Sequence, residues 1–493
     1  MKLNKLIKTN LDIEINGVTT YSKNTDKGFL FLCIKGSKTD RHLFIEDAAK
    51  RGAAAAIIDD KKYENSSIPT ILVDNVNDIY DSLIAKFYDN PQEKISLIAI
   101  TGTDGKTTTA AMVEQLIDKE VCANFGTNGA FFNGKRYRLN NTTPDSEAFY
   151  PLLAQFVKEG AKAAVIEFSS ESEHFGRLKD LKFDIIALTN ITSDHLNTHK
   201  TLKNYVNAKL NIFKNHLKIG GIAILNSSTK NFDRFKSEIE GNLSPLFIIS
   251  FGYKNDDTFK IKEIKEIYNR IEITFDFHNQ THEKHIQMLG KFNAYNYITA
   301  LAIQSALYKI WSDGGKNKKY VKDYTHSYIK FSIPGRANKF DTKDGISVII
   351  DYAHTLNSID NILEASTRGT LRKIIAVTGA AGDRDKSKRP KIAKLLEEKA
   401  DKIIFTTDDP HFEKPENIIN DLLSGIQNRK KVRVIPDRGK AINAALKIAE
   451  LGDTILILGK GDDDYIIVED EKIPFNDIEF IKNAFSKLNI TYI

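Results

Sequence analysis

Short apolar runs alternate with polar turns and helix-like periodicity along most of the chain, a pattern typical of α/β proteins. In the first part, the pattern of residues 44–51 predicts a helix, and the turn dipeptide Asn90-Pro91 marks an end. Strands are predicted by the apolar runs at 28–34, 53–58 and 68–73. We therefore expect a small α/β domain over residues 1–93.

The central part continues with strands that are nearly all apolar, as expected when a parallel strand is buried on both faces. A glycine-rich turn follows the first of them, and a helix pattern begins at Thr107. The predicted strands are 95–100, 163–168, 185–188 and 221–225. Strands that alternate with helices predict a doubly wound domain over residues 94–331.

A third α/β domain is expected over residues 332–493, after the linker-like segment Ser332-Ile-Pro-Gly-Arg336. Its apolar runs predict a Rossmann-like parallel sheet, with strands at 348–351, 374–378, 402–406 and 454–458. Each of these runs ends in a polar loop rich in glycine or aspartate. Ligands of open α/β sheets bind at the carboxyl ends of the strands, so these loops are where function is sought.

Composition narrows the class of protein. At 493 residues the chain is too long for one hydrophobic core. Its 71 basic and 65 acidic residues leave a formal charge of only +6, which does not predict nucleic-acid binding but suits a small polyanionic substrate. The two cysteines, Cys33 and Cys122, lie far apart, and we find neither a signal peptide nor an apolar run of about 18 residues. We expect a monomeric cytoplasmic protein that does not insert into membranes.

The clearest motif is Thr101-Gly-Thr-Asp-Gly-Lys-Thr107, where a strand runs into glycines and a helix opens with lysine and hydroxyl residues. Such a turn forms an anion cradle, in which Lys106 carries charge to the β- and γ-phosphates of ATP and Thr107 can bind Mg²⁺. An ordinary strand–turn–helix joint is the alternative. The predicted ATP contacts here are Gly102, Thr103, Asp104, Gly105, Lys106, Thr107 and Thr108.

The general phosphate-loop pattern has its first glycine where Ile100 stands. The displaced form Thr-Gly-Thr-x-Gly-Lys-Thr resembles the loop of the Mur ligase superfamily. Folylpolyglutamate synthases share this form, so the loop alone does not select a substrate.

Three further segments match the same superfamily: Glu167-Phe-Ser-Ser170, Thr189-Asn-Ile-Thr-Ser-Asp-His-Leu196 and Tyr205-Val-Asn-Ala-Lys209. The resemblance implies that Glu167 and His195 bind Mg²⁺ together with Thr107, and that Lys209 is carbamylated. A carbamate offers Mg²⁺ oxygens and negative charge, whereas an ammonium is repelled. Read singly, each side chain has a simpler explanation, and for Lys209 this is a solvent-facing helix position. The predicted catalytic residues are Lys106, Glu167, His195 and Lys209.

The nucleotide substrate of this family is a UDP-N-acetylmuramoyl dipeptide. Asn141-Thr-Thr-Pro-Asp145 matches the family's T-T-P motif, and the first 90 residues resemble its MurE-type uridine domain through Gly28-Phe-Leu-Phe-Leu-Cys-Ile-Lys-Gly36. Tyr21-Ser-Lys23 replaces the usual Asp-Ser-Arg. The substrate contacts implied by the resemblance are Ser22, Thr142, Thr143, Ser169 and Arg177.

Further ATP contacts are implied by Leu289-Gly-Lys-Phe-Asn-Ala-Tyr-Asn296 and Asp351-Tyr-Ala-His354. In the resemblance Asn293 and Asn296 line the adenine, although a helix N-cap is an alternative for these residues. Asp351 would bind the ribose hydroxyls, and Arg336 would neutralise phosphate charge. The chain departs from the family where Asn338 replaces a usual Glu and Leu356 a usual Pro.

The last motifs concern the amino acid that is added. Gly379-Ala-Ala-Gly-Asp-Arg-Asp-Lys-Ser-Lys-Arg-Pro390 matches G-x-x-G-x-R-D-x-x-K-R-P, which makes Arg384 the expected clamp for the α-carboxylate. In Asp408-Asp-Pro-His411, His411 stands where enzymes that add meso-diaminopimelate have Arg. Gly459-Lys-Gly-Asp-Asp463 replaces the usual G-K-G-x-E. Asp408, Asp409 and Asp463 then form an acidic pocket, which attracts an ammonium.

The resemblance thus implies an ATP-dependent ligase that forms an acyl phosphate and then an amide with a free diamino acid. We predict L-lysine, with L-ornithine and meso-diaminopimelate as alternatives, and closure of the third domain to complete the site. Another Mur step, a folylpolyglutamate synthase and a non-catalytic nucleotide-binding paralogue are the remaining interpretations.

Overall fold

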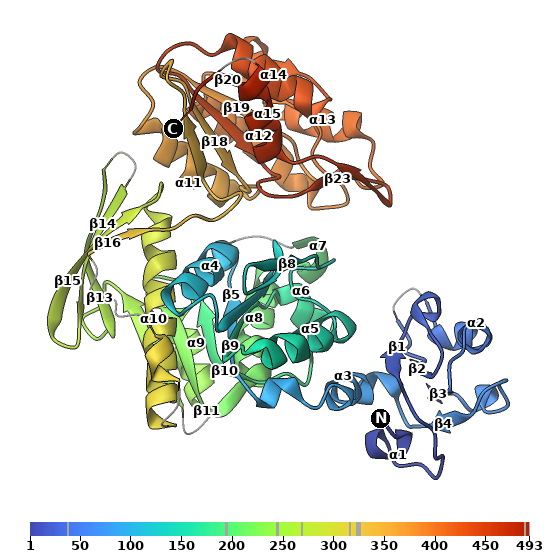
Figure 1. Cartoon of the computed structure of the whole chain (residues 1–493). Helices are drawn as coiled ribbons and strands as arrows, with labels where there is room; N and C mark the ends of the chain where they lie inside the picture. The colour runs from blue at the N-terminus through green and yellow to red at the C-terminus, as the bar shows by residue number, and fades with distance from the viewer. Residues whose placement is uncertain are drawn as a thin grey trace.

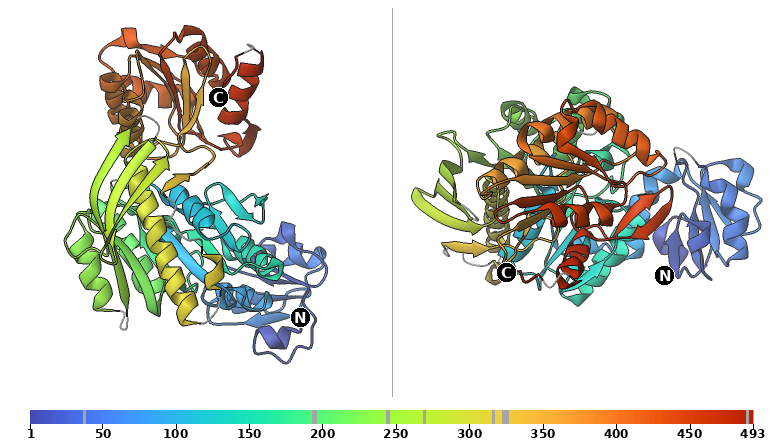
Figure 2. Two further views of the ribbon diagram at one scale, coloured as in Figure 1. Left: turned by 60° about the vertical axis from the view of Figure 1, so that its left-hand side comes forward. Right: turned by 90° about the horizontal axis from the view of Figure 1, so that it is seen from above.

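The computed structural model describes residues 1–36, 39–192, 196–242, 246–267, 270–314, 317–321, 327–487 and 490–492. They form the predicted three α/β domains, which follow one another in chain order (Figure 1). Seen from above, the C-terminal domain covers the central domain, whereas the N-terminal domain lies to one side (Figure 2). No helix among the described residues is both long and apolar enough to cross a membrane.

The N-terminal domain contains a parallel sheet of four strands in the order β1-β2-β3-β4. Its strands are β1 (Gly17–Thr19), β2 (Phe29–Leu32), β3 (Ala55–Ile58) and β4 (Thr70–Leu72). Its helices are α1 (Leu3–Leu6), α2 (Ile45–Lys50) and α3 (Val76–Phe87). The strands and the helix expected from the apolar pattern are all present, each slightly shorter than predicted.

The central domain contains a sheet of twelve strands, ordered β16-β15-β14-β13-β12-β11-β10-β5-β9-β6-β7-β8. Its parallel centre comprises β5 (Ser96–Thr101), β6 (Cys122–Gly126), β9 (Ala163–Glu167), β10 (Phe183–Leu188), β11 (Leu217–Asn226) and β12 (Phe247–Gly252). Its helices are α4 (Lys106–Leu116), α5 (Ser146–Glu159), α6 (Ser170–His174), α7 (Leu196–His199), α8 (Leu202–His216), α9 (Phe232–Glu240) and α10 (Phe292–Asp313). The predicted doubly wound arrangement is thereby confirmed for this centre.

Antiparallel strands extend both edges of this sheet, which the apolar pattern did not predict. On one side β13 (Phe259–Ile267) pairs in parallel with β12, the antiparallel strands β14 (Arg270–Phe277) and β15 (Gln280–Gln287) follow, and the short β16 (Tyr328–Lys330) is parallel to β15. On the other side is the hairpin β7 (Gly129–Phe132) and β8 (Lys135–Tyr137). Buried and more exposed positions alternate along β14, so these strands have one apolar face instead of two and lack a continuous apolar run.

The C-terminal sheet has the order β17-β18-β22-β19-β20-β21, parallel except for the edge strand β17. Its strands are β17 (Asn338–Asp341), β18 (Ser347–Asp351), β19 (Ile374–Thr378), β20 (Lys402–Phe405), β21 (Val432–Val434) and β22 (Thr454–Leu458), and a separate hairpin is made by β23 (Tyr465–Val468) and β24 (Glu471–Pro474). Its helices are α11 (Leu356–Thr367), α12 (Arg389–Lys399), α13 (Pro415–Ser424), α14 (Arg438–Ile448) and α15 (Asp477–Lys487).

The domains differ in how they are joined. One continuous apolar core runs from the N-terminal domain into the central domain, and the half-buried carboxylate of Glu147 accepts hydrogen bonds from the Thr19 hydroxyl (2.7 Å) and the Thr20 amide (3.0 Å) across their boundary. The C-terminal domain has two cores, one on each face of its own sheet, and Leu289 is the central-domain residue that enters one of them. Its remaining contacts with the central domain are largely polar.

Candidate functional site

The phosphate loop joins β5 to α4 at the carboxyl edge of the central sheet. Gly105 has φ +85°, and a Cβ there would lie 2.2 Å from Oδ1 of Asn296, so only glycine fits this turn. Lys106 folds over the loop, and its Nζ donates hydrogen bonds to the carbonyls of Gly102 (2.8 Å) and Thr103 (2.9 Å). The loop is therefore shaped as an anion cradle, with a lysine at its rim.

Beside this loop, a buried carboxylate and a hydroxyl come from neighbouring elements. Glu167 ends β9 and is 1% exposed. Its oxygens accept hydrogen bonds from the Thr107 hydroxyl (2.9 Å) and from the Thr127 amide (3.0 Å). The Arg336 guanidinium, from the segment that leads into the C-terminal domain, donates to the same Thr107 hydroxyl at 2.9 Å. Two domains thus meet at Thr107.

Thr107 and Glu167 offer the hard oxygen ligands that Mg²⁺ prefers, so the residues present fit the predicted cation. His195, the predicted imidazole ligand, lies outside the described residues. Within the described part of the chain, no cluster of three His, Cys, Asp or Glu side chains has a metal-binding arrangement. A magnesium site at this edge would therefore depend on groups such as the Thr107 hydroxyl, a modified lysine or His195.

Lys209 lies on α8 and is 1% exposed, so the alternative of a solvent-facing position is wrong. Its Nζ sits 4.6 Å from the centre of the Tyr205 ring, and the Tyr205 hydroxyl lies 3.0 Å from that of Thr103 in the phosphate loop. A buried ammonium needs a compensating partner, and so does a buried carbamate, for which a bound cation would serve. Burial next to the phosphate loop is consistent with the predicted modification.

The predicted contacts to the nucleotide substrate surround the end of β9. Thr143 is fully buried, and its hydroxyl donates to the Glu167 carbonyl (2.7 Å) and accepts from the Ser169 amide (3.0 Å). The hydroxyl of Thr142 lies 3.2 Å from that of Thr127. Thr143 therefore holds the Glu167–Ser169 turn in place, while Thr142 is the more accessible of the two.

Two other predicted substrate contacts lie further away. Arg177 lines a polar cavity of about 440 Å³ together with Lys179, Lys182 and Lys214. Ser22 is buried in the N-terminal domain, at the start of a short 3₁₀ helix. Their roles stay predictions.

The predicted adenine and ribose contacts are buried. α10 begins at Phe292, so neither Asn293 nor Asn296 is its N-cap, and that alternative is wrong. Asn296 donates to Oδ1 of Asn293 at 2.9 Å. Asp351 accepts from the amides of Ala337 and Ala353, each at 2.7 Å, and burial raises the pKa of its carboxyl against the opposing charge of Arg336. Asp351 thus anchors the segment that carries Arg336.

Both departures from the family pattern have a local explanation. The Asn338 side chain accepts a hydrogen bond from the Gly335 amide and so holds the turn before Arg336. Leu356 is the first residue of α11, a position where Pro is favoured but not needed.

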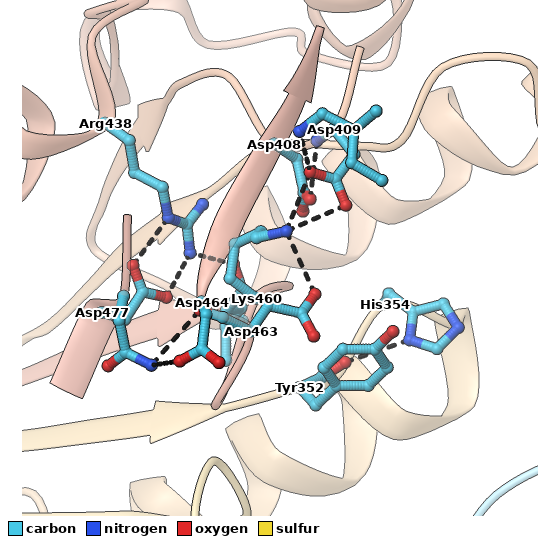
Figure 3. A network of polar contacts seen from close by, with 12 residues as sticks. Tyr352, His354, Asp408, Asp409, Arg438, Lys460, Asp463, Asp464 and Asp477 are labelled. Carbon is cyan, nitrogen blue, oxygen red and sulfur yellow. Dashed lines mark hydrogen bonds and ion pairs between the residues drawn. The ribbon is translucent and has the colours of Figure 1, made fainter. Parts of the chain in front are cut away.

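The three acids expected to form a pocket do gather, but around a lysine of the chain itself (Figure 3). Nζ of Lys460 lies 2.8 Å and 2.9 Å from the two oxygens of Asp409, and 3.0 Å from Oδ2 of Asp463. The Lys460 side chain is 1% exposed, whereas that of Asp463 is 26% exposed. Burial raises the pKa of Asp463 to about 6, although the Lys460 charge acts in the opposite direction.

Sequence reasoning did not assign a role to Lys460, although it lies inside the quoted Gly459–Asp463 motif. Asp409 Oδ1 also accepts from the Ile467 amide at 2.8 Å, so Asp409 is held by the chain on several sides. Asp408 is 7% exposed, and a Cβ on Gly459 would lie 2.3 Å from its Oδ2. Asp463 is therefore the acid that a ligand reaches most easily.

The loops after β19 and β20 pack directly on one another. The Gly382 amide donates to the Asp409 carbonyl at 2.8 Å, which brings the Arg384 loop beside the acids. The Arg384 side chain is 47% exposed, and its Nη1 lies 3.9 Å from Oε1 of Glu171 in the central domain. His411 adopts φ +49°, and its backbone pairs with the β23 strand. The roles of Arg384 and His411 stay predictions.

The chain matches known protein families over all three domains. Residues 14–88 match the catalytic domain of the Mur ligase family, residues 100–304 the Mur ligase middle domain, and residues 335–461 the Mur ligase glutamate ligase domain. A UDP-N-acetylmuramoyl-L-alanyl-D-glutamate–2,6-diaminopimelate ligase from Aquifex aeolicus is 34% identical over 476 residues, which cover 95% of this chain and 93% of that protein. The chain belongs to the Mur ligase family.

A ligase of the same description from Clostridium tetani is 32% identical to this Mur ligase over 506 residues, covering 99% of this chain and all of that protein. A solved structure of such a ligase has a TM-score of 0.64 with this Mur ligase at 25% identity, and the match covers both chains completely. MurF from Thermotoga maritima, solved in complex with ADP, has a TM-score of 0.63 at 19% identity, covers 95% of this chain and 97% of its own, and shows the shared fold.

These relatives establish the class of reaction. This Mur ligase is an ATP-dependent ligase of peptidoglycan synthesis. A folylpolyglutamate synthase from Mycobacterium tuberculosis shares the fold with a TM-score of 0.59, but the match covers only 77% of this chain.

Proposed function

We propose that this Mur ligase adds a diamino acid, L-lysine, to UDP-N-acetylmuramoyl-L-alanyl-D-glutamate. In this proposal residues 1–93 bind the uridine nucleotide, residues 94–331 bind ATP, and residues 332–493 bind the amino acid. L-ornithine, which is one methylene shorter, is the nearest alternative amino acid. The cluster of acids around Lys460 is the observation that carries the choice of lysine.

The charge of this cluster supports a cationic distal group. Asp408, Asp409 and Asp463 surround one ammonium, so with all three ionised the group keeps a charge of −2. A second ammonium is attracted to such a group, while a second carboxylate is repelled. Two of these acids, Asp409 and Asp463, accept hydrogen bonds from the Lys460 ammonium, which supports the choice of a cationic ligand.

The main alternative is meso-diaminopimelate, which the names of the relatives specify for those proteins. Its distal carboxylate needs a cation, and His411 stands where the family's diaminopimelate-adding members have an arginine. Arg389, the first residue of α12, is 1% exposed and already bound by Glu413 and Asp421. Arg384 is more exposed, and we assign it to the α-carboxylate that both amino acids share.

In the proposed reaction the γ-phosphoryl group of ATP passes to a substrate carboxylate, which leaves ADP and an acyl phosphate. The amine of the diamino acid then attacks the acyl carbon, phosphate departs and an amide remains. Lys106 and Arg336 balance the charge of the transferring group, and no covalent bond to the enzyme forms. Mg²⁺, held by Thr107, Glu167, His195 and carbamylated Lys209, would supply further charge neutralisation.

The test is phosphate release from ATP in the presence of the UDP-muramoyl dipeptide and either L-lysine, L-ornithine or meso-diaminopimelate. We expect kcat/KM to be highest with L-lysine. The matched variant His411→Arg, which restores the arginine of diaminopimelate-adding enzymes, should shift preference toward meso-diaminopimelate. Turnover of the unchanged enzyme with meso-diaminopimelate alone would refute the role assigned to the acidic cluster, without affecting its identity as a ligase.

A further inference from the structure

Both ends of one helix in the C-terminal domain are held by acidic side chains of the central domain. This helix is α11 (Leu356–Thr367), which lies at the side of its domain that faces the central domain (Figure 1). At its start, Oγ1 of Thr355 and Nδ2 of Asn357 donate to the two carboxylate oxygens of Asp104, each at 3.1 Å. At its end, the Arg368 guanidinium donates to Oε2 of Glu266 at 2.9 Å.

The first of these acids belongs to the phosphate loop. A carboxylate is poorly suited to contact a polyphosphate, because like charges repel. The backbone of Asp104 is fixed on the central domain, since its amide donates to the Asn190 side chain (3.0 Å) and its carbonyl accepts from the Thr189 hydroxyl (2.7 Å). Its side chain instead accepts the two donors from the start of α11. Any movement of the phosphate loop therefore moves a docking point of the C-terminal domain.

The second acid is tied to the other predicted nucleotide segment. Glu266 lies near the end of β13 and is 3% exposed at its side chain. While its Oε2 accepts from Arg368, its Oε1 accepts from the Gly290 amide at 2.7 Å. Gly290 leads into α10, whose Asn296 side chain lies against Gly105. One buried carboxylate thus links this segment to the far end of α11.

The charges at both ends follow the dipole of the helix. The start of α11 carries partial positive charge and meets the Asp104 carboxylate, whereas its negative end carries Arg368, which meets Glu266. The residues involved are the caps of the helix themselves: Thr355 is its N-cap and Arg368 its C-cap. The Thr355 hydroxyl accepts from the Ser358 amide (3.0 Å) while it donates to Asp104, so capping and docking share one group.

We propose that Asp104 and Glu266 are positioning residues, which set the placement of the C-terminal domain through the two ends of α11. Through Asp104 this placement depends on the phosphate loop, and through Glu266 it depends on the segment before α10. They act through α11 and not by contact with the nucleotide. Correct placement of α11 brings Arg336 and the amino-acid loops to the phosphate loop. This role needs only the ligase activity of the family and holds for any amino acid that is added.

The test separates nucleotide binding from turnover in the variants Asp104→Ala, Glu266→Ala and Asn357→Ala. ADP binding is measured by equilibrium dialysis, and kcat by phosphate release with the amino acid that the unchanged enzyme uses best. Because hydrogen bonds to a charged group are lost, kcat should fall about tenfold or more, while the Kd of ADP changes by less than about threefold. Asn357→Ala should add little loss to Asp104→Ala, because the two side chains act as one contact.

Glu364→Ala is the matched control, since Glu364 is the other acid that Arg368 contacts, at 3.3 Å within α11 itself. It should leave kcat near that of the unchanged enzyme. If it lowers kcat as much as Glu266→Ala does, the effect comes from the stability of the helix and the proposal fails. It also fails if Asp104→Ala weakens ADP binding as strongly as it lowers kcat, or if Asp104→Ala and Asn357→Ala leave kcat unchanged. Asn357 is exposed, so its variant is expected to fold.

Discussion

The Arg336 guanidinium reaches across a domain boundary and donates a hydrogen bond to the Thr107 hydroxyl at 2.9 Å. Thr107 in turn donates to the buried Glu167 carboxylate, also at 2.9 Å. The guanidinium of the segment that leads into the C-terminal domain, a hydroxyl of the phosphate loop and a carboxylate of β9 thus form one chain of contacts. A change in the position of the C-terminal domain therefore changes the contacts of Thr107 in the phosphate loop.

Replacement of Arg336 by Ala should lower kcat about a hundredfold, because one donor to the charge that develops in the transition state is removed. Arg336→Lys should recover only part of the loss, since an ammonium keeps the charge but not the fork of donors. Phosphate release at saturating substrates measures both. Arg372→Ala removes a half-exposed arginine of the same domain, which pairs with Glu450, and serves as the control. Equal losses in Arg336→Ala and Arg372→Ala would contradict the assignment.

Lys209→Ala should abolish turnover, and added bicarbonate should not restore it, because no amine remains to form a carbamate. In the unchanged protein, ¹³C-labelled bicarbonate should give a carbamate resonance that is missing from Lys209→Ala. Lys203→Ala, on the exposed side of the same helix, should retain both the signal and the activity. An active Lys209→Ala variant would remove the carbamate from the mechanism.

The pH dependence of amino-acid binding should report on Asp463. Burial raises the pKa of this carboxyl to about 6, and only its ionised form attracts an ammonium. The KM for the amino acid should therefore rise as the pH falls through about 6, while the distal amine of the diamino acid stays protonated throughout. Lys460→Met removes the cation that holds this pKa down, so the rise should begin at higher pH. In Asp463→Asn this component should disappear; a KM independent of pH in the unchanged enzyme would contradict the role of Asp463.

Arg389 and Glu413 should contribute to the stability of the C-terminal domain. The Arg389 side chain is 1% exposed and makes two hydrogen bonds to the Glu413 carboxylate, at 2.9 Å and 2.8 Å. Glu413→Ala leaves this charge without its main partner and should lower the free energy of unfolding by about 3 kcal/mol, measured in urea. Asp421, the second partner of Arg389, is half-exposed. Asp421→Ala should therefore lower the free energy of unfolding by about 1 kcal/mol or less.

The same pair has a defined pH window. Hydrogen bonds from Arg389 lower the pKa of Glu413 to about 2, below its value in the unfolded chain. A lowered folded-state pKa means that the stabilisation is complete above the unfolded pKa and is lost as the pH falls toward about 2. Glu413→Gln should therefore flatten the acid limb of the stability curve in this window.

The parallel centres of both large sheets were predictable, because strands such as β5 (Ser96–Thr101) and β22 (Thr454–Leu458) are buried along nearly their whole length and appear as apolar runs. The phosphate loop was predictable for a similar reason, since its glycines and Lys106 are adjacent in sequence. The edge strands β13 to β15 were not, because one exposed face breaks the run. For such strands the alternation of single residues is the signal to seek.

The candidate site was predictable only as a set of motifs. The sequence predicted that Asp409 and Asp463 share one pocket, but not that Lys460 lies between them. Lys460 belongs to the Gly459–Asp463 motif, of which only Asp463 was given a role in the site. The contact of Asp104 with ATP stays a prediction, but sequence did not indicate that its carboxylate accepts a hydrogen bond from Thr355, 251 residues away. Such pairings depend on how the domains dock, and no local pattern records them.

The apolar core shared by the first two domains has a consequence for how the protein melts. Separation of these two domains would expose buried hydrophobic side chains and break the hydrogen bonds to Glu147. The two domains should therefore unfold as a single cooperative unit. The two cores of the C-terminal domain contain one residue of the central domain, Leu289, so this domain should give a second transition. Differential scanning calorimetry should then resolve two heat-absorption peaks instead of three. A ligand that binds both the central and the C-terminal domain should bring the two peaks closer together.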